Sequence, residues 1–285
     1  MRSTGKKRLS RSFGGDLLAR LFMIAAGLFT AIPLIYSVLN AFKPVNELYQ
    51  YPPRFFVLRP TADNFLDLFR LQQDMLVPIE RYAFNSILVT FAATAGYIII
   101  ASLAAYPMAK HRFHGKTVLI SFVVGAILFR TEVTSVPQFI ILSKLGLVDT
   151  YGALIFPAFA ASFGVFLMKQ FMEQIPNELI EAAKVDGASE LCIFRRIVMS
   201  ICRPAWLTLA ILTFQSVWNQ TGVQYIYDEA LKTLPAALSQ LGTSGLSRVG
   251  VTSAVTFLLM LPPIVMFAAT QSAVMETMAY SGLKG

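Results

Sequence analysis

Long stretches without a charged residue constrain this sequence more than any other feature. Residues 21–42 contain no Asp, Glu, Lys or Arg, and residues 82–109 form a second such run. A helix needs about 20 apolar residues to cross a bilayer, so each run is long enough for one span. The 285-residue chain is 55% hydrophobic and 14% charged, whereas soluble domains carry about 25% charged residues. The pattern predicts an all-α membrane protein with several transmembrane helices.

Six transmembrane helices are expected in all. They cover residues 21–42, 82–109, 117–142, 150–168, 204–227 and 249–275. Residues 1–20 form a basic N-terminal segment, residues 21–275 a single membrane domain, and residues 276–285 a short tail. The first apolar run is too long for the core of a signal peptide and precedes no cleavage site, which favours a retained anchor. Pro262-Pro263 should kink the last span, and a short helix is expected at Asp63–Leu71.

The distribution of Lys and Arg predicts the orientation of these spans. With the N-terminus inside, the inner segments hold 15 Lys and Arg and the outer loops hold 8. Inner loops of membrane proteins are enriched in these residues, so we expect both termini to be cytoplasmic. The same rule accounts for the net charge of +8 without a nucleic acid partner.

The segment between the fourth and fifth spans, residues 172–203, is too charged to cross a membrane. Leu179, Ile180 and Ala183 fall on one side of a short helix, which predicts an amphipathic element. We call residues 172–203 the elbow, because a second helix is expected to leave the first at an angle.

Three residues set the predicted corner of the elbow. Asp186 and Gly187 should end the first helix, since glycine accepts the left-handed conformation found at helix C-termini. Ser189 then stands at a suitable N-cap position for a second helix that runs to about Met199.

The elbow resembles the EAA loop of ABC importer permeases. The matching residues, at the spacing of that motif, are Glu181, Ala182, Ala183, Gly187 and Ile197. Met199 and Ser200 depart from it, because the motif has Leu and Pro there. The resemblance implies a cytoplasmic coupling helix that docks into a separate ATPase. The alternative is a surface amphipathic helix whose alanines reflect helix propensity alone.

The predicted ATPase-coupling residues have side chains that suit docking. Small Ala182 and Ala183 let another backbone approach closely, and Glu181 or Asp186 can pair with a basic group on the ATPase. Gly187 forms the corner between the two helices.

Further matches extend the resemblance over most of the chain, to sugar-uptake permeases of the maltose-transporter type and their shorter subunit. They are Tyr82–Ser86, Ala104–Pro107, Pro137 with Leu145–Thr150, Trp218-Asn219 and the ending Gly282–Gly285. The resemblance implies half of the translocation pathway of an ATP-driven importer of sugars or oligosaccharides in a bacterial cytoplasmic membrane. Its implied partners are a second, different permease, two ATPase subunits, an extracytoplasmic solute-binding protein, the oligosaccharide and the lipid bilayer. The partner ATPase binds ATP and Mg, so no cofactor is expected in this chain.

Polar side chains inside the spans are candidates for the translocation pathway. A charge at mid-bilayer costs about 2.5–3.5 kcal/mol on insertion scales, so Arg130 and Glu132 should face protein or water. We hypothesise that Arg130 meets a carboxylate of an acidic oligosaccharide; a salt bridge to a partner subunit or snorkelling to the surface is the alternative. Amides bind sugar hydroxyls, but they also join membrane helices to one another. The amide candidates are Asn85, Gln215, Asn219 and Gln220.

Other functions find little support in the sequence. His111 and His114 lie in one basic loop without further ligands, so no metal site is expected. Gly115-Lys116-Thr117 lacks the first glycine of a phosphate loop, because residue 110 is Lys. No serine stands in a nucleophile context, so we predict no catalytic residues and no enzyme. An ion-coupled secondary transporter remains the alternative, although it would be expected to carry an internal repeat.

Overall fold

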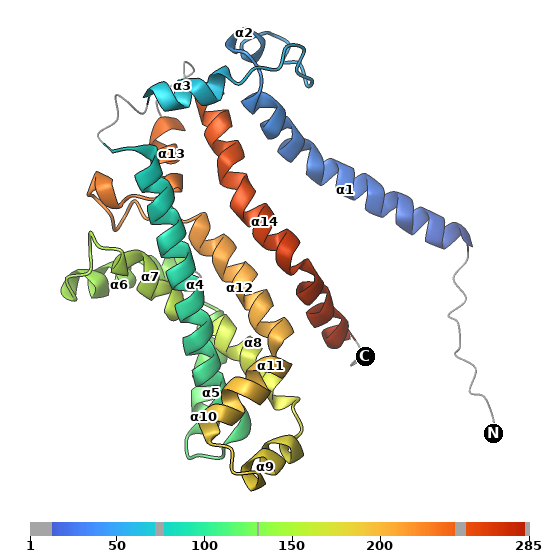
Figure 1. Ribbon diagram of the computed structural model, residues 1–285, viewed down its shortest axis with the longest axis vertical. Helices are drawn as coiled ribbons and strands as arrows, with labels where there is room; N and C mark the ends of the chain where they lie inside the picture. The colour runs from blue at the N-terminus through green and yellow to red at the C-terminus, as the bar shows by residue number, and fades with distance from the viewer. Residues whose placement is uncertain (1–12, 72–76, 130, 243–248, 283–285) are drawn as a thin grey trace. The chain divides into compact units, whose positions relative to one another are not determined.

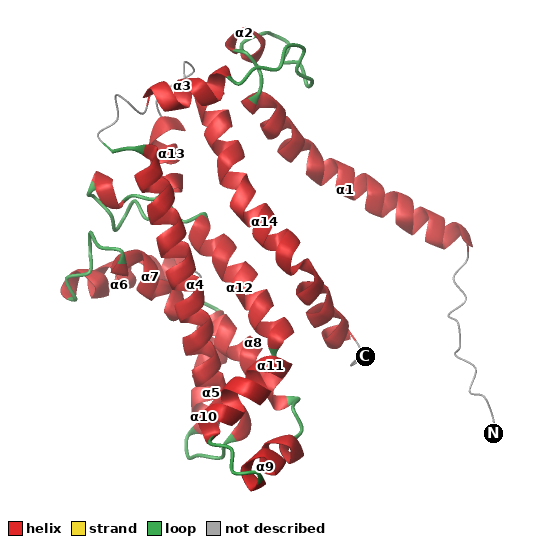
Figure 2. Ribbon diagram, in the orientation of Figure 1, coloured by secondary structure: helices red, strands yellow, loops and turns green. Residues whose placement is uncertain are grey.

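The computed structural model describes residues 13–71, 77–129, 131–242 and 249–282, and all regular elements in these ranges are helices (Figure 2). The prediction of an all-α protein is confirmed for this part of the chain. The chain divides into two compact units. One comprises the described residues of 1–69 and 245–257, and the other comprises those of 70–244 and 258–285.

The helices follow one another along the chain (Figure 1). They are α1 (Phe13–Ala41), α2 (Val45–Leu48), α3 (Asp63–Leu71), α4 (Ile79–Lys110), α5 (Lys116–Ile127), α6 (Thr131–Lys144), α7 (Gly152–Phe159), α8 (Ser162–Glu173), α9 (Asn177–Val185), α10 (Glu190–Ile193), the π-helix η2 (Phe194–Val198), α11 (Met199–Ile201), α12 (Arg203–Trp218), the 3₁₀ helix η3 (Glu229–Leu231), α13 (Leu234–Gly242) and α14 (Val249–Gly282). The short helix expected at Asp63–Leu71 is α3.

Three of these helices are long and apolar enough to cross a membrane, within α1, α4 and α14, and two bent helix pairs raise the count to as many as five. The membrane class is therefore confirmed, whereas a count of six spans goes beyond what these helices show. α14 continues as one helix through Pro262 and Pro263.

The third predicted span, residues 117–142, is not one helix. α5 ends at Ile127, and α6 begins at Thr131 after a turn through Leu128 and Phe129. The 12 residues of α5 extend about 18 Å at 1.5 Å per residue, less than a bilayer core of about 30 Å. The prediction joined two apolar helices because the sequence between them holds no glycine or proline.

Residues of the fourth predicted span form two helices, α7 and α8, which meet at an angle of 40° with a break at Ala160 and Ala161. The hydroxyl of Tyr97 in α4 bridges this break, since it donates to the carbonyl of Ala161 at 2.6 Å and accepts from the amide of Gly164 at 2.7 Å. A membrane gives no water to satisfy such backbone groups, so a side chain from a neighbouring helix must do it. Gly164 allows the approach: a Cβ there would lie 2.4 Å from the Tyr97 oxygen.

The fifth predicted span, residues 204–227, ends nine residues early. α12 stops at Trp218, and the following residues form a loop. Asp149 fastens this loop, because its Oδ1 accepts from the amides of Tyr227 and Asp228 at 2.9 and 2.8 Å. The apolar side chains of Val223, Tyr225 and Ile226 extended the hydrophobic pattern, but Tyr225 and Ile226 are buried in protein, in a cluster with Leu154.

The second unit is organised around α4. α8 and α12 pack along it (Figure 1), and its buried face is rich in small residues that let helices approach closely. Its N-terminal end contacts α13, through Tyr82 with Leu234 and Ala237. Its C-terminal end meets the elbow, so the two ends of one helix support different parts of the molecule.

Candidate functional site: the elbow

The elbow consists of two arms with a sharp corner between them. α9 forms the first arm, and residues 190–201 form the second, a continuous run of α10, η2 and α11. At Cys202 the chain bends by 78° into α12. The indole Nε1 of Trp206 donates to the carbonyl of Met199 at 3.1 Å, which braces this bend.

The first arm ends as the sequence predicts. Gly187 has φ of +79°, a left-handed conformation that costs other residues about 1–2 kcal/mol. Its amide donates to the carbonyl of Lys184 at 3.0 Å, and the amide of Ala188 donates to the carbonyl of Ala183 at 2.9 Å. This pair of bonds is the Schellman motif that closes helix C-termini.

The second arm begins at the predicted N-cap. The Oγ of Ser189 accepts from the amide of Cys192 at 3.4 Å, and Glu190 supplies an acidic residue in the first turn, where the helix dipole favours it. The five residues of η2 widen the arm by a π turn. The arm extends two residues beyond the predicted Met199, to Ile201.

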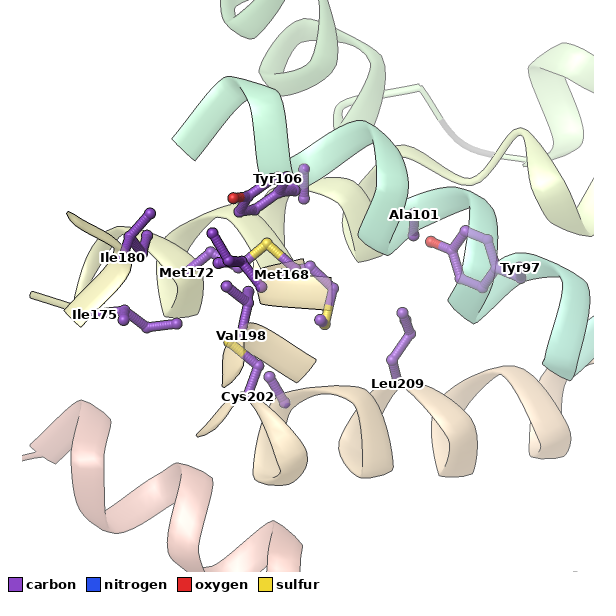
Figure 3. Close-up of a cluster of buried hydrophobic side chains, with 13 residues drawn as sticks. Tyr97, Ala101, Tyr106, Met168, Met172, Ile175, Ile180, Val198, Cys202 and Leu209 are labelled. Atoms are coloured by element: carbon purple, nitrogen blue, oxygen red, sulfur yellow. The ribbon is translucent and has the colours of Figure 1, made fainter. Parts of the chain in front are cut away.

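One side of the elbow is buried in the second unit (Figure 3). Ile180 of the first arm and Ile193 and Val198 of the second enter a cluster with Met168 and Met172 of α8. Ile193 and Val198 are fully buried. The sequence placed Leu179, Ile180 and Ala183 on one apolar side of the helix. Ile180 is buried and Ala183 is partly buried as that pattern implies, whereas Leu179 is 47% exposed.

The opposite side of the first arm is exposed. Glu181, Ala182 and Asp186 are all exposed, and Ala183 is partly buried against the cluster. Val185 is 88% exposed. Val185 and Ala182 are therefore presented away from the protein's own core, among the exposed carboxylates of Glu178, Glu181 and Asp186.

Glu190 connects the elbow to the end of α4. Its carboxylate lies 2.5 Å from the Nζ of Lys184 and accepts from the Tyr106 hydroxyl at 2.9 Å. The imidazole Nε2 of His111 lies 3.7 Å away. The Lys184 and Tyr106 hydrogen bonds lower the pKa of Glu190 below its ordinary value, so the carboxylate is ionised at neutral pH and this tie is lost only in acid.

A second tie joins the same end of α4 to the start of the first arm. The Nζ of Lys110 donates to the carbonyl of Ile175 and to the Oδ1 of Asn177. Sequence reasoning did not single out Glu190, Tyr106 or Lys110 as elbow residues. The sequence feature that could have indicated Glu190 is its charge in the first turn after the N-cap. Tyr106 and Lys110 lie far from the elbow in the sequence, so no local pattern connects them with it.

The candidate pathway residues have diverse surroundings. Asn85 is fully buried; its Nδ2 donates to the carbonyls of Ala230 and Lys232, both at 2.8 Å, and its Oδ1 accepts from the Tyr151 hydroxyl at 2.7 Å. In this structure Asn85 therefore joins α4 to the loop after α12 and to α7.

The remaining amides lie at the C-terminal end of α12. Gln215 and Gln220 are partly exposed, and Asn219 is exposed, with its Nδ2 donating to the carbonyl of Gln215 at 2.8 Å. Arg130 lies outside the described residues, as does the side chain of Glu132. Within the described residues no group of three or more His, Cys, Asp and Glu is arranged to hold a metal ion.

The model of the family "Binding-protein-dependent transport system inner membrane component" matches residues 117–274, more than half of the chain, and the chain belongs to this family. It is thus an inner-membrane permease of an ABC importer, a transport component without enzymatic activity or a cofactor of its own. This membership excludes the ion-coupled secondary transporter.

Two relatives and one solved structure are similar to this chain over most of its length. The permease YtcP of the polygalacturonan/rhamnogalacturonan transport system of Bacillus subtilis is 31% identical over 79% of this chain and 77% of that protein. The permease SmoH of the sulfoquinovosyl glycerol transport system of Agrobacterium fabrum is 28% identical over 97% of both. A bacterial ABC transporter that imports the acidic polysaccharide alginate contains a chain with a TM-score of 0.76, 21% identity, and coverage of 92% of this chain and 98% of that one.

Proposed function

We propose that this permease imports a sugar or oligosaccharide, and that it forms half of the pathway together with a second, different permease. Two ATPase subunits and an extracytoplasmic solute-binding protein complete the importer. The cargo named for YtcP and for the alginate importer supports a saccharide substrate. Side-chain amides form hydrogen bonds with sugar hydroxyls, so our candidates for contacts with the saccharide remain Gln215, Asn219 and Gln220.

The observation that carries the proposal is the exposed side of the first arm. Val185 and Ala182 are exposed among the carboxylates of Glu178, Glu181 and Asp186, and a docking surface combines small or apolar side chains with polar ones in this way. We infer that this side enters a cleft of the ATPase. The elbow and both chain termini then lie in the cytoplasm, which fits the excess of Lys and Arg in those segments.

Alternating access follows from this arrangement. ATP binding closes the paired ATPases and displaces the elbow, whose buried side carries the displacement into α4 and α8 through the cluster around Met168 and Met172. Rocking of these helices opens the pathway toward the loaded binding protein. The chain supplies the pathway, and the ATPase supplies the chemical energy.

A bulky side chain at Ala182 tests the docking surface. Because Ala182 is exposed, Ala182→Trp should leave the melting temperature within about 1 °C of wild type, since surface changes rarely exceed about 0.5 kcal/mol. We expect the amount of ATPase subunit that copurifies with the permease to fall about tenfold or more, because the indole blocks close approach at the centre of the interface.

Ala62→Trp is the matched control, since Ala62 is also exposed but precedes α3 in the first unit. It should retain the ATPase like the wild type. Full retention by Ala182→Trp would contradict the proposal.

We further propose that the substrate is acidic and that Arg130 meets its carboxylate. A charge inside a membrane needs a counter-charge or water, and an acidic cargo would provide an anionic partner for Arg130 during import. Arg130→Gln should then reduce uptake of charged oligosaccharides about tenfold while neutral ones of the same length are affected less. Equal loss for both in a liposome uptake assay would assign Arg130 to a structural contact instead.

A further inference from the structure

The corner of the elbow has little packing of its own. A Cβ at Gly187 would find no atom within 4 Å, and its left-handed backbone is held by two backbone hydrogen bonds. Two helical arms joined at such a corner would bend there under load. The ion pair of Lys184 with Glu190 crosses this corner, because Lys184 belongs to the first arm and Glu190 begins the second.

The carboxylate of Glu190 also makes contacts outside the elbow. Its Oε2 accepts from the hydroxyl of Tyr106, a buried residue in the last two turns of α4, and the ring of Tyr106 packs on Phe194 of the second arm and on His111. Glu190 thus contacts three segments: the first arm, the end of α4 and the connection after α4. A network of this kind fixes geometry better than an isolated surface ion pair does.

We propose that Glu190 is a positioning residue for energy coupling. By tying Lys184 and Tyr106 to the second arm, it makes both arms and the end of α4 move as one body. The inference rests on the proposed function, in which the ATPase displaces the first arm. When the tie is absent, the first arm bends at Gly187 as the ATPase closes, and α4 moves less for each ATP consumed.

The experiment measures substrate imported per ATP hydrolysed, with the complete importer in liposomes. Glu190→Ala should retain the ATPase and hydrolyse ATP near the wild-type rate, while import per ATP falls about fivefold or more. Tyr106→Phe removes only the hydroxyl and should lower the same ratio less. Glu190→Gln should restore part of the ratio, because its single amide oxygen can accept from Lys184, which uses Oε1 of the carboxylate, while its NH2 group faces the Tyr106 oxygen at the Oε2 position and can donate to it.

The opposite end of α4 provides a matched control. There the carboxylate of Glu229 accepts from the Tyr82 hydroxyl at 2.7 Å and pairs with Lys232 at 2.5 Å. This arrangement repeats the chemistry around Glu190 away from the elbow. Glu229→Ala removes an equivalent tyrosine–carboxylate–lysine contact, so it can lower stability or total rate but should leave import per ATP unchanged.

The outcomes separate this inference from the proposed function. A wild-type ratio in Glu190→Ala, or an equal loss in Glu229→Ala, would overturn the role of Glu190 while the importer assignment stands. A wild-type permease that binds no ATPase would instead refute the docking proposal. If Glu190→Ala fails to fold, Lys184→Met removes the ion pair from its exposed partner and should lower the ratio in the same direction; an unchanged ratio there also overturns the inference.

Discussion

Replacing Gly187 with proline is expected to abolish import and to release the ATPase from the permease. Proline fixes φ near −65°, whereas Gly187 has φ of +79° and donates its amide to the carbonyl of Lys184. The substitution therefore removes the hydrogen bond and redirects the first arm relative to the second. We expect the amount of ATPase subunit that copurifies with the permease to fall about tenfold or more, since a misdirected first arm loses the central contacts of its interface.

Gly146→Pro is a close control for this substitution. Gly146 also follows a helix, has φ of +67°, donates its amide to Ser143 at 3.1 Å and has open space where a Cβ would stand. It lies after α6, away from the elbow. Both variants should lose comparable stability, but only Gly187→Pro should lose the ATPase. Wild-type retention by Gly187→Pro, or equal release by both, would contradict the assignment of the corner.

Replacing Asn85 with leucine is expected to cause a large loss of stability. The amide of Asn85 satisfies two carbonyls and one hydroxyl in a fully buried position. Leucine would remove the amide partner of the Lys232 carbonyl and of the Tyr151 hydroxyl, while the Ala230 carbonyl would still accept from the Nε of Arg81 at 3.3 Å. Each buried group left without a partner costs about 1–3 kcal/mol, so we expect a destabilisation of about 3–5 kcal/mol. Thermal unfolding in detergent measures this change as a lower melting temperature.

Asn219→Leu is the corresponding control, because Asn219 is exposed and bonds only within its own helix turn, to Gln215. Its melting temperature should stay close to that of the wild type. If Asn85→Leu instead unfolds like the wild type and raises the KM for import, then Asn85 contacts substrate and the structural role is wrong. The pair of variants thus decides between helix joining and a place in the pathway.

Local chemistry made the elbow predictable from its sequence. A left-handed corner demands glycine, and an N-cap favours serine, so Gly187 and Ser189 mark the two helix ends without knowledge of the rest of the fold. The spans within α1, α4 and α14 were predictable for a similar reason, because crossing a bilayer requires a long uncharged run. Each of these signals lies within a few neighbouring residues or within one continuous segment.

The features that depend on distant residues were not predictable. The early end of α12 depends on Asp149, which fastens residues 227 and 228 from a different part of the chain. The break between α7 and α8 depends on Tyr97 in α4, and the network at Glu190 depends on Tyr106. Hydropathy counts apolar atoms but does not say whether lipid or protein covers them, so residues 223–226 looked like part of a span.

The chain has two cysteines, and their side chains differ in exposure because only one of them lies at the bend that ends the elbow. Cys202 is fully buried at the bend, whereas Cys192 in the second arm is partly exposed. A thiol-reactive fluorophore should therefore attach to the native chain at one position. Such a label would report nucleotide-driven movement in real time without any engineered residue.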